Sequence, residues 1–174
     1  MEIELRCKAP SHIHDRVLSL RAVKKSQKIE DDEYFKFALD VERKLVLRIR
    51  RKNTGESLLT FKGSSKAPED TAWQEWETSA NDPEALKKLL LSNGLVSVVR
   101  IVKNRTTYKL EDFEINVDEI QDLGTFVEVE LQSEDFVIAH KRIRELLARM
   151  DIHERDIITK GYVPLMIEKN AQQN

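Results

Sequence analysis

The first six residues of this 174-residue chain alternate charged and aliphatic side chains: Met1-Glu2-Ile3-Glu4-Leu5-Arg6. Side chains of a β-strand point to opposite faces with a period of two. The two glutamates and Arg6 therefore share one face of a predicted strand, and the aliphatic residues face a core. Two carboxylates beside a guanidinium can form a divalent-metal site next to an anion site. Taken alone, the segment also fits a sheet with one solvated face.

The composition indicates one domain that is large enough to have its own core, because 40% of the residues are hydrophobic and 34% are charged. Lys and Arg number 29 against 31 Asp and Glu, so no overall basic field points to nucleic acid or an anionic membrane. Cys7 is the only cysteine, which excludes an intrachain disulfide and fits a reducing compartment. No apolar run could span a bilayer and no signal-peptide pattern is present. We therefore expect a cytoplasmic protein with no nucleic-acid or membrane partner.

Hydrophobic periodicity and turn signals predict an α+β protein with seven or eight antiparallel strands and three or four helices. Helices are expected at 11–22, from about 81–84 to 93–94, at 134–150 and at 162–168. Beyond the first segment, strands are expected at 24–37, 44–51, 57–62, 71–79, 96–110, 113–120 and 126–131. We expect a single domain over residues 1–168 and a disordered tail at 169–174.

Charges of the two signs separate cleanly when the faces of all predicted strands are compared, and most pairs have i, i+2 spacing. The basic set is Arg48, Arg50, Lys62, Lys103 and Arg105, and the acidic set is Glu2, Glu4, Glu75, Glu77, Asp118, Glu128 and Glu130. On a flat sheet these charges are solvated, and each pair contributes ~0 to 1 kcal/mol. In a barrel they line the interior, which is costly unless water, metal and a polyanion occupy it. A polyphosphate with Mg²⁺ or Mn²⁺ suits such a set best.

The motifs resemble those of the CYTH superfamily, the triphosphate tunnel metalloenzymes, which include class IV adenylyl cyclases and thiamine triphosphatases. Residues 2–6 resemble the Glu-x-Glu-x-Lys signature of that family, and further motifs follow in the expected order. They are Leu47-Arg48-Ile49-Arg50, residues 59–63, Glu75-Trp76-Glu77, residues 102–105, Asn116-Val117-Asp118 and residues 123–130. The resemblance spans about residues 1–131, and Tyr162-Val163-Pro164-Leu165 is similar to a weaker C-terminal motif.

The resemblance implies a closed eight-stranded antiparallel β-barrel, the triphosphate tunnel, wrapped by helices, that works with Mg²⁺ or Mn²⁺. It also implies roles for individual residues. The metal ligands would be Glu2, Glu4, Glu128 and Glu130, with Glu75 and Glu77 as supporting acidic residues. The triphosphate would be bound by Arg48, Arg50, Lys62, Lys103 and Arg105, and the catalytic set would be Arg6, Asp118 and Tyr34.

Two departures from the family pattern bear on the mechanism. Arg6 stands where the signature has lysine, and Thr71-Ala72-Trp73-Gln74 lacks the basic residue often found before the Glu-x-Glu strand. A guanidinium stays protonated at any working pH. Arg6 can therefore bind phosphate, but it cannot act as the amine of a Lys–Tyr proton relay.

The resemblance leaves three functions to compare. The first is a class IV adenylyl cyclase-like enzyme that converts ATP to cyclic AMP and pyrophosphate. The second is a phosphohydrolase of inorganic triphosphate or thiamine triphosphate, which needs only a different register of the triphosphate relative to the metal. The third is a module that binds polyphosphate or nucleotides without turnover. A homodimer is compatible with each of them.

Overall fold

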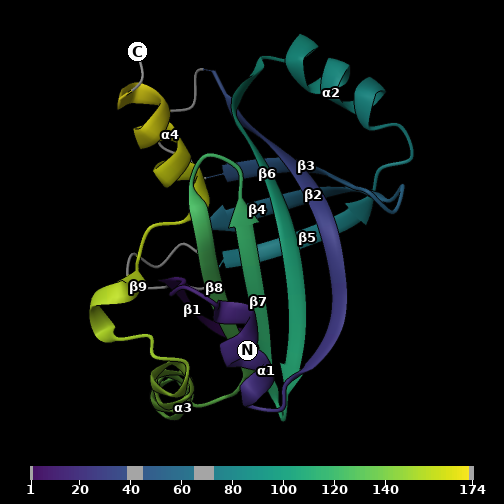
Figure 1. The fold of residues 1–174 in the computed structure, drawn as a ribbon. Coiled ribbons are helices and arrows are strands. Elements are labelled where there is room, and N and C mark those ends of the chain that lie inside the picture. The colour runs from purple at the N-terminus through teal and green to yellow at the C-terminus, as the bar shows by residue number, and fades with distance from the viewer. Residues whose placement is uncertain (1, 39–44, 65–72, 173–174) are drawn as a thin grey trace. The chain divides into compact units, whose positions relative to one another are not determined.

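The computed structural model describes residues 2–38, 45–64 and 73–172 (Figure 1). Within these ranges, the side chains of a few strand residues lie outside the description: Glu2, Leu45, Lys62, Ser64 and residues 73–75. The roles expected for Glu2, Lys62 and Glu75 therefore rest on side chains that the structure does not describe. The motif departure at 71–74 also falls outside the described side chains.

The described part of the chain forms a nine-stranded antiparallel sheet and four α-helices, which confirms the α+β class. The strands are β1 (Glu2–Lys8), β2 (Val23–Phe37), β3 (Leu45–Lys52), β4 (Ser57–Ser64), β5 (Trp73–Ser79), β6 (Leu95–Leu110), β7 (Phe113–Ile120), β8 (Gly124–Gln132) and β9 (Ile157–Ile158). The helices are α1 (Ile13–Ser19), α2 (Pro83–Ser92), α3 (Phe136–Arg149) and α4 (Tyr162–Gln172), with a 3₁₀ turn, η1, at Glu154–Asp156. The strand order is β5-β4-β3-β2-β6-β7-β8-β1-β9.

The strand count differs from the expected eight by the short strand β9, which pairs with β1 through Arg6↔Ile158 and Cys7↔Ile157. Two residues are too few to give an alternation signal in the sequence. Closure of the sheet into a barrel stays a prediction. Helix α4 continues through residues 169–172, which we expected in a disordered tail, and residues 173–174 lie outside the described range. None of the described helices is both long and apolar enough to cross a membrane.

The chain divides into two compact units, and the first comprises Met1–Lys28 and Lys103–Leu165. In this unit β7 pairs with β8 and β8 pairs with β1, all antiparallel. Helix α3 packs on β1 and β8. The core contains Ile115 and Val117 of β7, Val127 and Val129 of β8, and aliphatic residues of α3 such as Ile143. One face of these strands is therefore buried beneath a helix, as the sequence pattern predicted.

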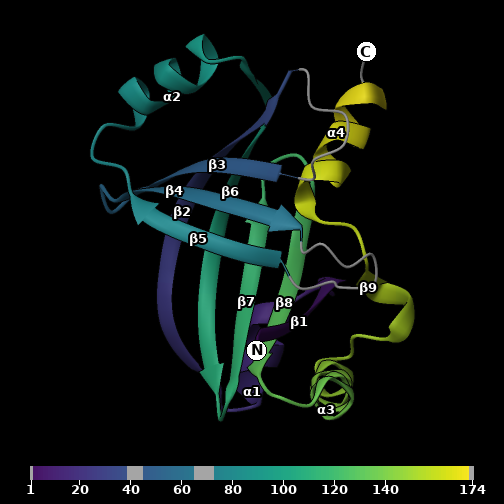
Figure 2. The same cartoon turned by 180° about the vertical axis from the view of Figure 1, so that it is seen from behind.

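The second unit comprises Ile29–Val102 and Met166–Asn174. Strands β2, β3, β4 and β5 pair in this order, and Figure 2 shows β3, β4 and β5 side by side. Its core contains Phe35, Leu47, Ile49 and Leu95, against which Leu86 and Leu90 of α2 pack. Helix α2 begins at the expected signal, because the Asp82 side chain accepts a hydrogen bond from Ala85 N at 2.9 Å.

Candidate functional site

Several polar side chains of the strands are buried in each unit. In the first unit Asp118, Asn116, Lys103 and Glu128 are 0 to 4% exposed. In the second unit five polar strand residues are 0 to 9% exposed: Glu30, Asp32, Arg48, Arg50 and Thr60. Ionised groups remain in such places only when they are paired or bind an ion. These side chains are therefore not solvated, whereas Glu4 and Glu77, with side chains 47% and 41% exposed, lie at the edge of the buried polar groups.

Three glutamates of the first unit form a candidate metal site. Carboxylate oxygens of Glu4, Glu128 and Glu130 all lie within 4.8 Å of one another. Antiparallel pairing of β1 with β8 creates this cluster, because Glu4 is opposite Glu130 and Arg6 is opposite Glu128. The Nδ2 of Asn116 donates to Glu130 at 3.0 Å and so orients that carboxylate. A donor set made only of carboxylate oxygens fits a hard cation such as Mg²⁺ or Mn²⁺.

Two arginines bind the carboxylate of Glu128, one at each of its two oxygens. Arg6 Nε donates to Glu128 Oε1 at 2.5 Å, and Arg105 Nη2 donates to Glu128 Oε2 at 2.5 Å. Arg6 also contacts Glu4 at 3.2 Å. Burial opposes ionisation of Glu128, but Arg105, Arg6 and Lys103 outweigh it and lower its pKa from 4.5 to about 2. Glu128 is therefore a carboxylate throughout the neutral range.

Asp118 is a second carboxylate that binds Arg105, in addition to Glu128. The guanidinium donates to the two carboxylate oxygens of Asp118 at 2.6 and 2.5 Å, which is a bidentate pair. Asp118 is fully buried, and its Oδ2 also accepts a hydrogen bond from the hydroxyl of Tyr162 at 3.0 Å. The side chain is thus surrounded by donors, which makes it an anchor for a cation.

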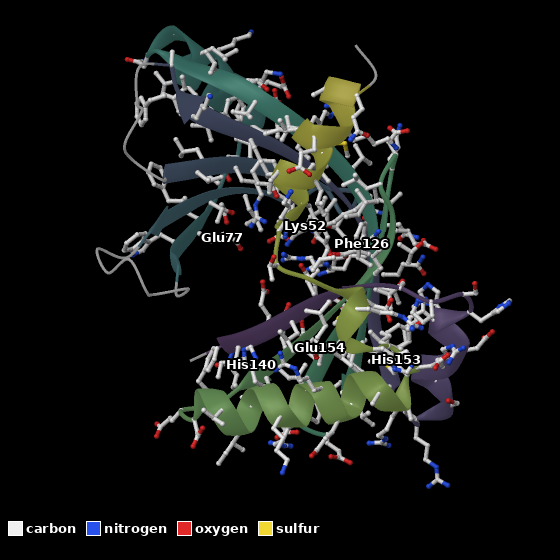
Figure 3. All side chains as sticks on the ribbon, turned by 90° about the vertical axis from the view of Figure 1, so that its left-hand side faces the viewer. Lys52, Glu77, Phe126, His140, His153 and Glu154 are labelled. Carbon is white, nitrogen blue, oxygen red and sulfur yellow. The ribbon has the colours of Figure 1, made fainter. Side chains whose placement is uncertain are left out.

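Tyr162 was not among the predicted site residues, yet it contacts several of them. Its ring lies under the guanidinium of Arg6 at 4.5 Å and within 5.7 Å of the ammonium of Lys103. The ring packs against Phe126 of β8, labelled in Figure 3, with centroids 5.3 Å apart. The weak C-terminal motif was the only sequence signal for Tyr162.

In the second unit, neighbouring strands assemble an arginine site. Arg50 forms a bidentate pair with Asp32 at 2.7 and 2.8 Å and contacts Glu30 at 3.2 Å. Arg48 donates to Thr60 at 2.9 Å and contacts Glu77 at 3.4 Å. The register explains these contacts, because Asp32 is opposite Arg50 and Arg48 is opposite Thr60.

Tyr34, another predicted site residue, is half-buried beside this arginine site. Its hydroxyl lies 3.4 Å from Asp32 Oδ2. Burial, and then the charge of Asp32, raise the pKa of Tyr34. The phenol is therefore a proton-bearing donor at neutral pH and not a tyrosinate base.

The structure groups the predicted residues by unit. In the first unit it brings together Glu4, Arg6, Lys103, Arg105, Asp118, Glu128 and Glu130, and in the second unit Tyr34, Arg48, Arg50 and Glu77. The prediction missed Asp32 and Glu30, although both share the i, i+2 spacing of Tyr34 on β2. Their importance depends on being opposite β3, and sequence spacing does not give this register.

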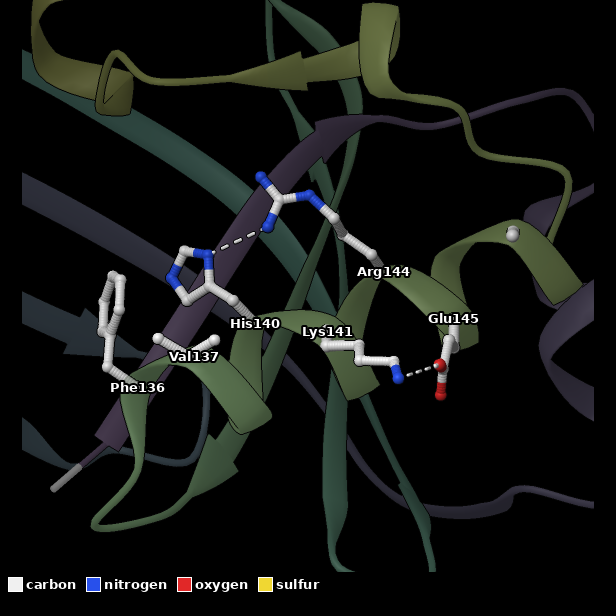
Figure 4. Close-up of a pocket in the computed structure, with 7 residues that line it drawn as sticks. Phe136, Val137, His140, Lys141, Arg144 and Glu145 are labelled. Carbon is white, nitrogen blue, oxygen red and sulfur yellow. Dashed lines mark hydrogen bonds and ion pairs between the residues drawn. The ribbon is translucent and has the colours of Figure 1, made fainter.

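A cavity of about 580 Å³ lies elsewhere, along the outer side of α3 (Figure 4). Its lining comes entirely from that helix: Phe136, Val137, His140, Lys141, Arg144, Glu145 and Ala148. Arg144 is paired there with Glu154 of η1 at 3.0 Å and contacts His140 at 3.1 Å. None of the predicted site residues whose side chains the structure describes lines it.

Most of the chain matches a protein-family model. The model of the CYTH domain matches residues 1–162, and the chain therefore belongs to the CYTH family. A putative adenylate cyclase of Methanocaldococcus jannaschii is 29% identical over 177 residues, with 95% of this chain and 98% of the relative covered.

Solved structures share the fold. A protein from Pyrococcus horikoshii is 25% identical, with 95% of this chain and 99% of the other covered and a TM-score of 0.82. A putative adenylyl cyclase from Hippeastrum, described as having a dominant triphosphatase activity, is 17% identical. It superimposes with a TM-score of 0.69 over 98% of this chain and 96% of its own. The family expected from the motifs is therefore confirmed.

Proposed function

We propose that this chain is a metal-dependent triphosphate-processing enzyme and that its reaction is that of a class IV adenylyl cyclase, conversion of ATP to cyclic AMP and pyrophosphate. The observation that carries the proposal is the carboxylate cluster Glu4, Glu128 and Glu130, whose central member binds Arg6 and Arg105. In such an arrangement the carboxylates can bind a cation and the adjacent arginines can bind a phosphate chain. The similarity to a putative adenylate cyclase supports the choice of reaction.

The residues that would hold Mg²⁺ or Mn²⁺ are Glu4, Glu128 and Glu130, with Glu2 as the fourth carboxylate proposed. When bound, the ion would supply a Lewis acid that polarises phosphoryl oxygens. Asn116 fixes the orientation of Glu130 through its 3.0 Å hydrogen bond. Orientation of a ligand by a neighbouring hydrogen bond is a common support of metal sites.

The residues that would bind the triphosphate are Arg48, Arg50, Lys62, Lys103 and Arg105. Guanidinium groups bind phosphate oxygens in a bidentate fashion. Arg48 and Arg50 are held in place by Thr60 and Asp32, so little side-chain freedom is left to lose on binding. Attack of the 3′-hydroxyl oxygen on the α-phosphorus would break the bond from that phosphorus to the bridging oxygen and release the hydroxyl proton to water. Arg48 and Arg50 would stabilise the charge of the leaving pyrophosphate.

The three residues proposed as catalytic have different roles in this scheme. Burial alone would lower the pKa of Arg6, but Glu128 and the other anionic partners raise it overall, so Arg6 is a permanent cation beside the phosphates. Tyr34 keeps its proton and can donate a hydrogen bond. Asp118 contributes by holding Arg105 in its bidentate pair.

A second candidate reaction is hydrolysis of inorganic triphosphate or thiamine triphosphate. The structurally similar Hippeastrum protein is described as having a dominant triphosphatase activity, which supports this alternative. The same charged residues would serve it, with water attacking the terminal phosphorus. Only the register of the triphosphate relative to the carboxylates would differ.

Product analysis decides between these reactions. The purified protein is incubated with ATP or inorganic triphosphate and Mg²⁺ or Mn²⁺, and products are followed by chromatography and phosphorus NMR. Cyclic AMP with pyrophosphate is the expected result. Orthophosphate from inorganic triphosphate without cyclic AMP would replace the cyclase with the hydrolase. No product from any mixture would leave only the polyphosphate- or nucleotide-binding module.

The metal site is tested by Glu130→Gln, which keeps the side-chain volume and removes a charge. We expect at least ~10²-fold slower turnover, because loss of a metal ligand costs several kcal/mol of transition-state stabilisation. Glu145→Gln on the outer side of α3 is the matched control, since Glu145 is 63% exposed and contacts only Lys141 among the described ion pairs. Equal rates for the two variants would contradict the metal assignment.

A further inference from the structure

Tyr162 is the first residue of α4, and it is only 7% exposed. Within the first unit its ring contacts two cations. The guanidinium of Arg6 lies 4.5 Å from the ring centroid and the ammonium of Lys103 lies 5.7 Å from it. Both distances are within the range of a cation–π interaction. The ring therefore contacts two residues proposed to bind phosphate.

The hydroxyl of Tyr162 contacts a third member of the site. It donates to Asp118 Oδ2 at 3.0 Å, and the same oxygen accepts from Arg105 Nη2 at 2.5 Å. Because Asp118 is fully buried, this hydrogen bond is formed away from water. The hydroxyl thus fixes the carboxylate that in turn holds Arg105.

We propose that Tyr162 is a positioning residue of the triphosphate site, whose ring orients Arg6 and Lys103 and whose hydroxyl orients Arg105 through Asp118. The inference rests on the proposed function, since it assigns these cations to a triphosphate. In this proposal Tyr162 acts only through these side chains.

The presence of arginine at position 6 gives this contact a particular consequence. A planar guanidinium can lie flat on an aromatic ring and still direct its N–H groups sideways, whereas an ammonium has no plane to align. In this chain the sideways donors of Arg6 reach Glu128 and Glu4. The contact with the ring of Tyr162, 4.5 Å from ring centroid to Arg6 Cζ, therefore limits the positions from which Arg6 offers its hydrogen bonds.

The inference is tested by calorimetric titration of inorganic triphosphate into the metal-free protein, which needs no turnover. Tyr162→Leu removes the ring and the hydroxyl, and we expect about 3- to 30-fold weaker binding. Tyr162→Phe keeps the ring and removes the hydroxyl, so a smaller loss is expected. Tyr108→Phe is the matched control, because Tyr108 is also buried and its hydroxyl lies 2.7 Å from His14 Nδ1. Its affinity should equal that of the wild type.

A double-mutant cycle separates positioning from a merely structural role. In an Arg6→Lys background the ring has no guanidinium to align, so Tyr162→Leu should weaken triphosphate binding less than it does in the wild type. Additive effects of the two substitutions, or unchanged affinity in both Tyr162 variants, would overturn the proposal. If Tyr162→Leu does not fold, the cycle is run with Tyr162→Phe against Asp118→Asn, the two ends of the hydroxyl contact.

The result for the wild-type protein distinguishes failure of this inference from failure of the proposed function. A wild-type protein that binds no triphosphate would overturn the proposed function and the role of Tyr162 together. A wild-type protein that binds triphosphate, with Tyr162 variants that bind it equally well, would overturn only the positioning role.

Discussion

Glu128 links the carboxylate cluster of the first unit to two of its arginines. One carboxylate oxygen accepts from Arg6 and the other from Arg105, and the side chain also belongs to the carboxylate cluster. A buried carboxylate in such surroundings stays ionised because two guanidinium groups replace its hydration. The site is therefore already charged and ordered before any ligand binds.

The depressed pKa of Glu128 predicts how stability depends on pH. A carboxylate whose pKa is lower in the folded state stabilises the protein fully above its unfolded pKa, and this contribution is lost as the pH falls through the folded value of about 2. Metal-free wild type should lose on the order of 3 kcal/mol more of its unfolding free energy than Glu128→Gln between pH 5 and pH 2. Urea unfolding at several pH values measures this, with Glu145→Gln as control. Parallel curves for wild type and Glu128→Gln would refute the prediction.

Arg50 and Arg100 provide a matched pair of arginine–aspartate contacts. Arg50 pairs with buried Asp32, whereas Arg100 pairs with Asp31 and its side chain is 64% exposed. Arg50→Ala should destabilise the fold by about 3 to 5 kcal/mol, because it deprives a buried carboxylate of its bidentate partner. Arg100→Ala should cost about 0 to 1 kcal/mol. Chemical denaturation measures both.

The same two variants also test the assignment of Arg50 to phosphate binding. Under conditions where both are folded, triphosphate titration should give at least ~10-fold weaker binding for Arg50→Ala, since a positive charge beside the phosphates is lost. Arg100→Ala should bind like the wild type. The assignment would be wrong if Arg50→Ala retained wild-type affinity.

Cys7 is fully buried in the core of the first unit and should be unreactive. Burial, helped by the charges of Asp156 and Glu154, raises the pKa of its thiol to about 12. Only the thiolate attacks disulfides. The rate of modification by Ellman's reagent at pH 8 should thus be at least ~10²-fold lower in the native protein than in urea. Similar rates in the two states would show that the thiol is accessible.

At the scale of single residues, the sequence indicated which types of side chain form the site but not their partners. The alternation in residues 2–6 correctly placed Ile3 in a core and Glu4 on the polar face. The bidentate pairs of Arg50 and Arg105 could not be predicted, because each depends on the register of two strands. Tyr162 lies far along the chain from Arg6, and only the tertiary structure brings the ring to the guanidinium.

At the scale of elements, most of the strands and helices could be predicted because their signals are local. Asp82 before Pro83 marked the start of α2, and the helix ends before Gly94, which has a positive φ of 83°. Strand β9 was missed because it consists of two residues that pair with β1. Helix α1 is shorter than the expected 11–22. It begins at Ile13, after His12 in a left-handed conformation, and it ends at Ser19, before Arg21, which also has a positive φ of 66°.

Helix α3 gives a test at this scale. Its N-cap residue is Asp135, whose side chain accepts a hydrogen bond from Ile138 N at 2.9 Å. Asp135→Ala should lower the unfolding free energy by about 1 kcal/mol, because one backbone donor of the first turn loses its partner. Glu134→Ala, one residue earlier, is the control. Thermal unfolding should show a lower melting temperature for Asp135→Ala only, and equal melting temperatures would contradict the capping role.

At the scale of the molecule, the decisive property is that each unit buries several charged side chains of its strands. The first unit buries Asp118 and Glu128, and the second buries Asp32, Arg48 and Arg50. Replacing buried ion pairs by apolar residues often stabilises a protein, so their presence indicates a function other than stability. The chain belongs to the CYTH family, and we propose that these buried charges bind a triphosphate together with a divalent metal.

Binding of a triphosphate tests this account most directly, since the cyclase, the hydrolase and the binding module all require it. Wild-type protein is titrated calorimetrically with inorganic triphosphate without metal, and then with a non-hydrolysable triphosphate analogue and Mg²⁺. We predict one site per chain, with affinity that increases when Mg²⁺ is present and falls with rising salt. Absence of binding up to millimolar triphosphate, with and without Mg²⁺, would contradict the account.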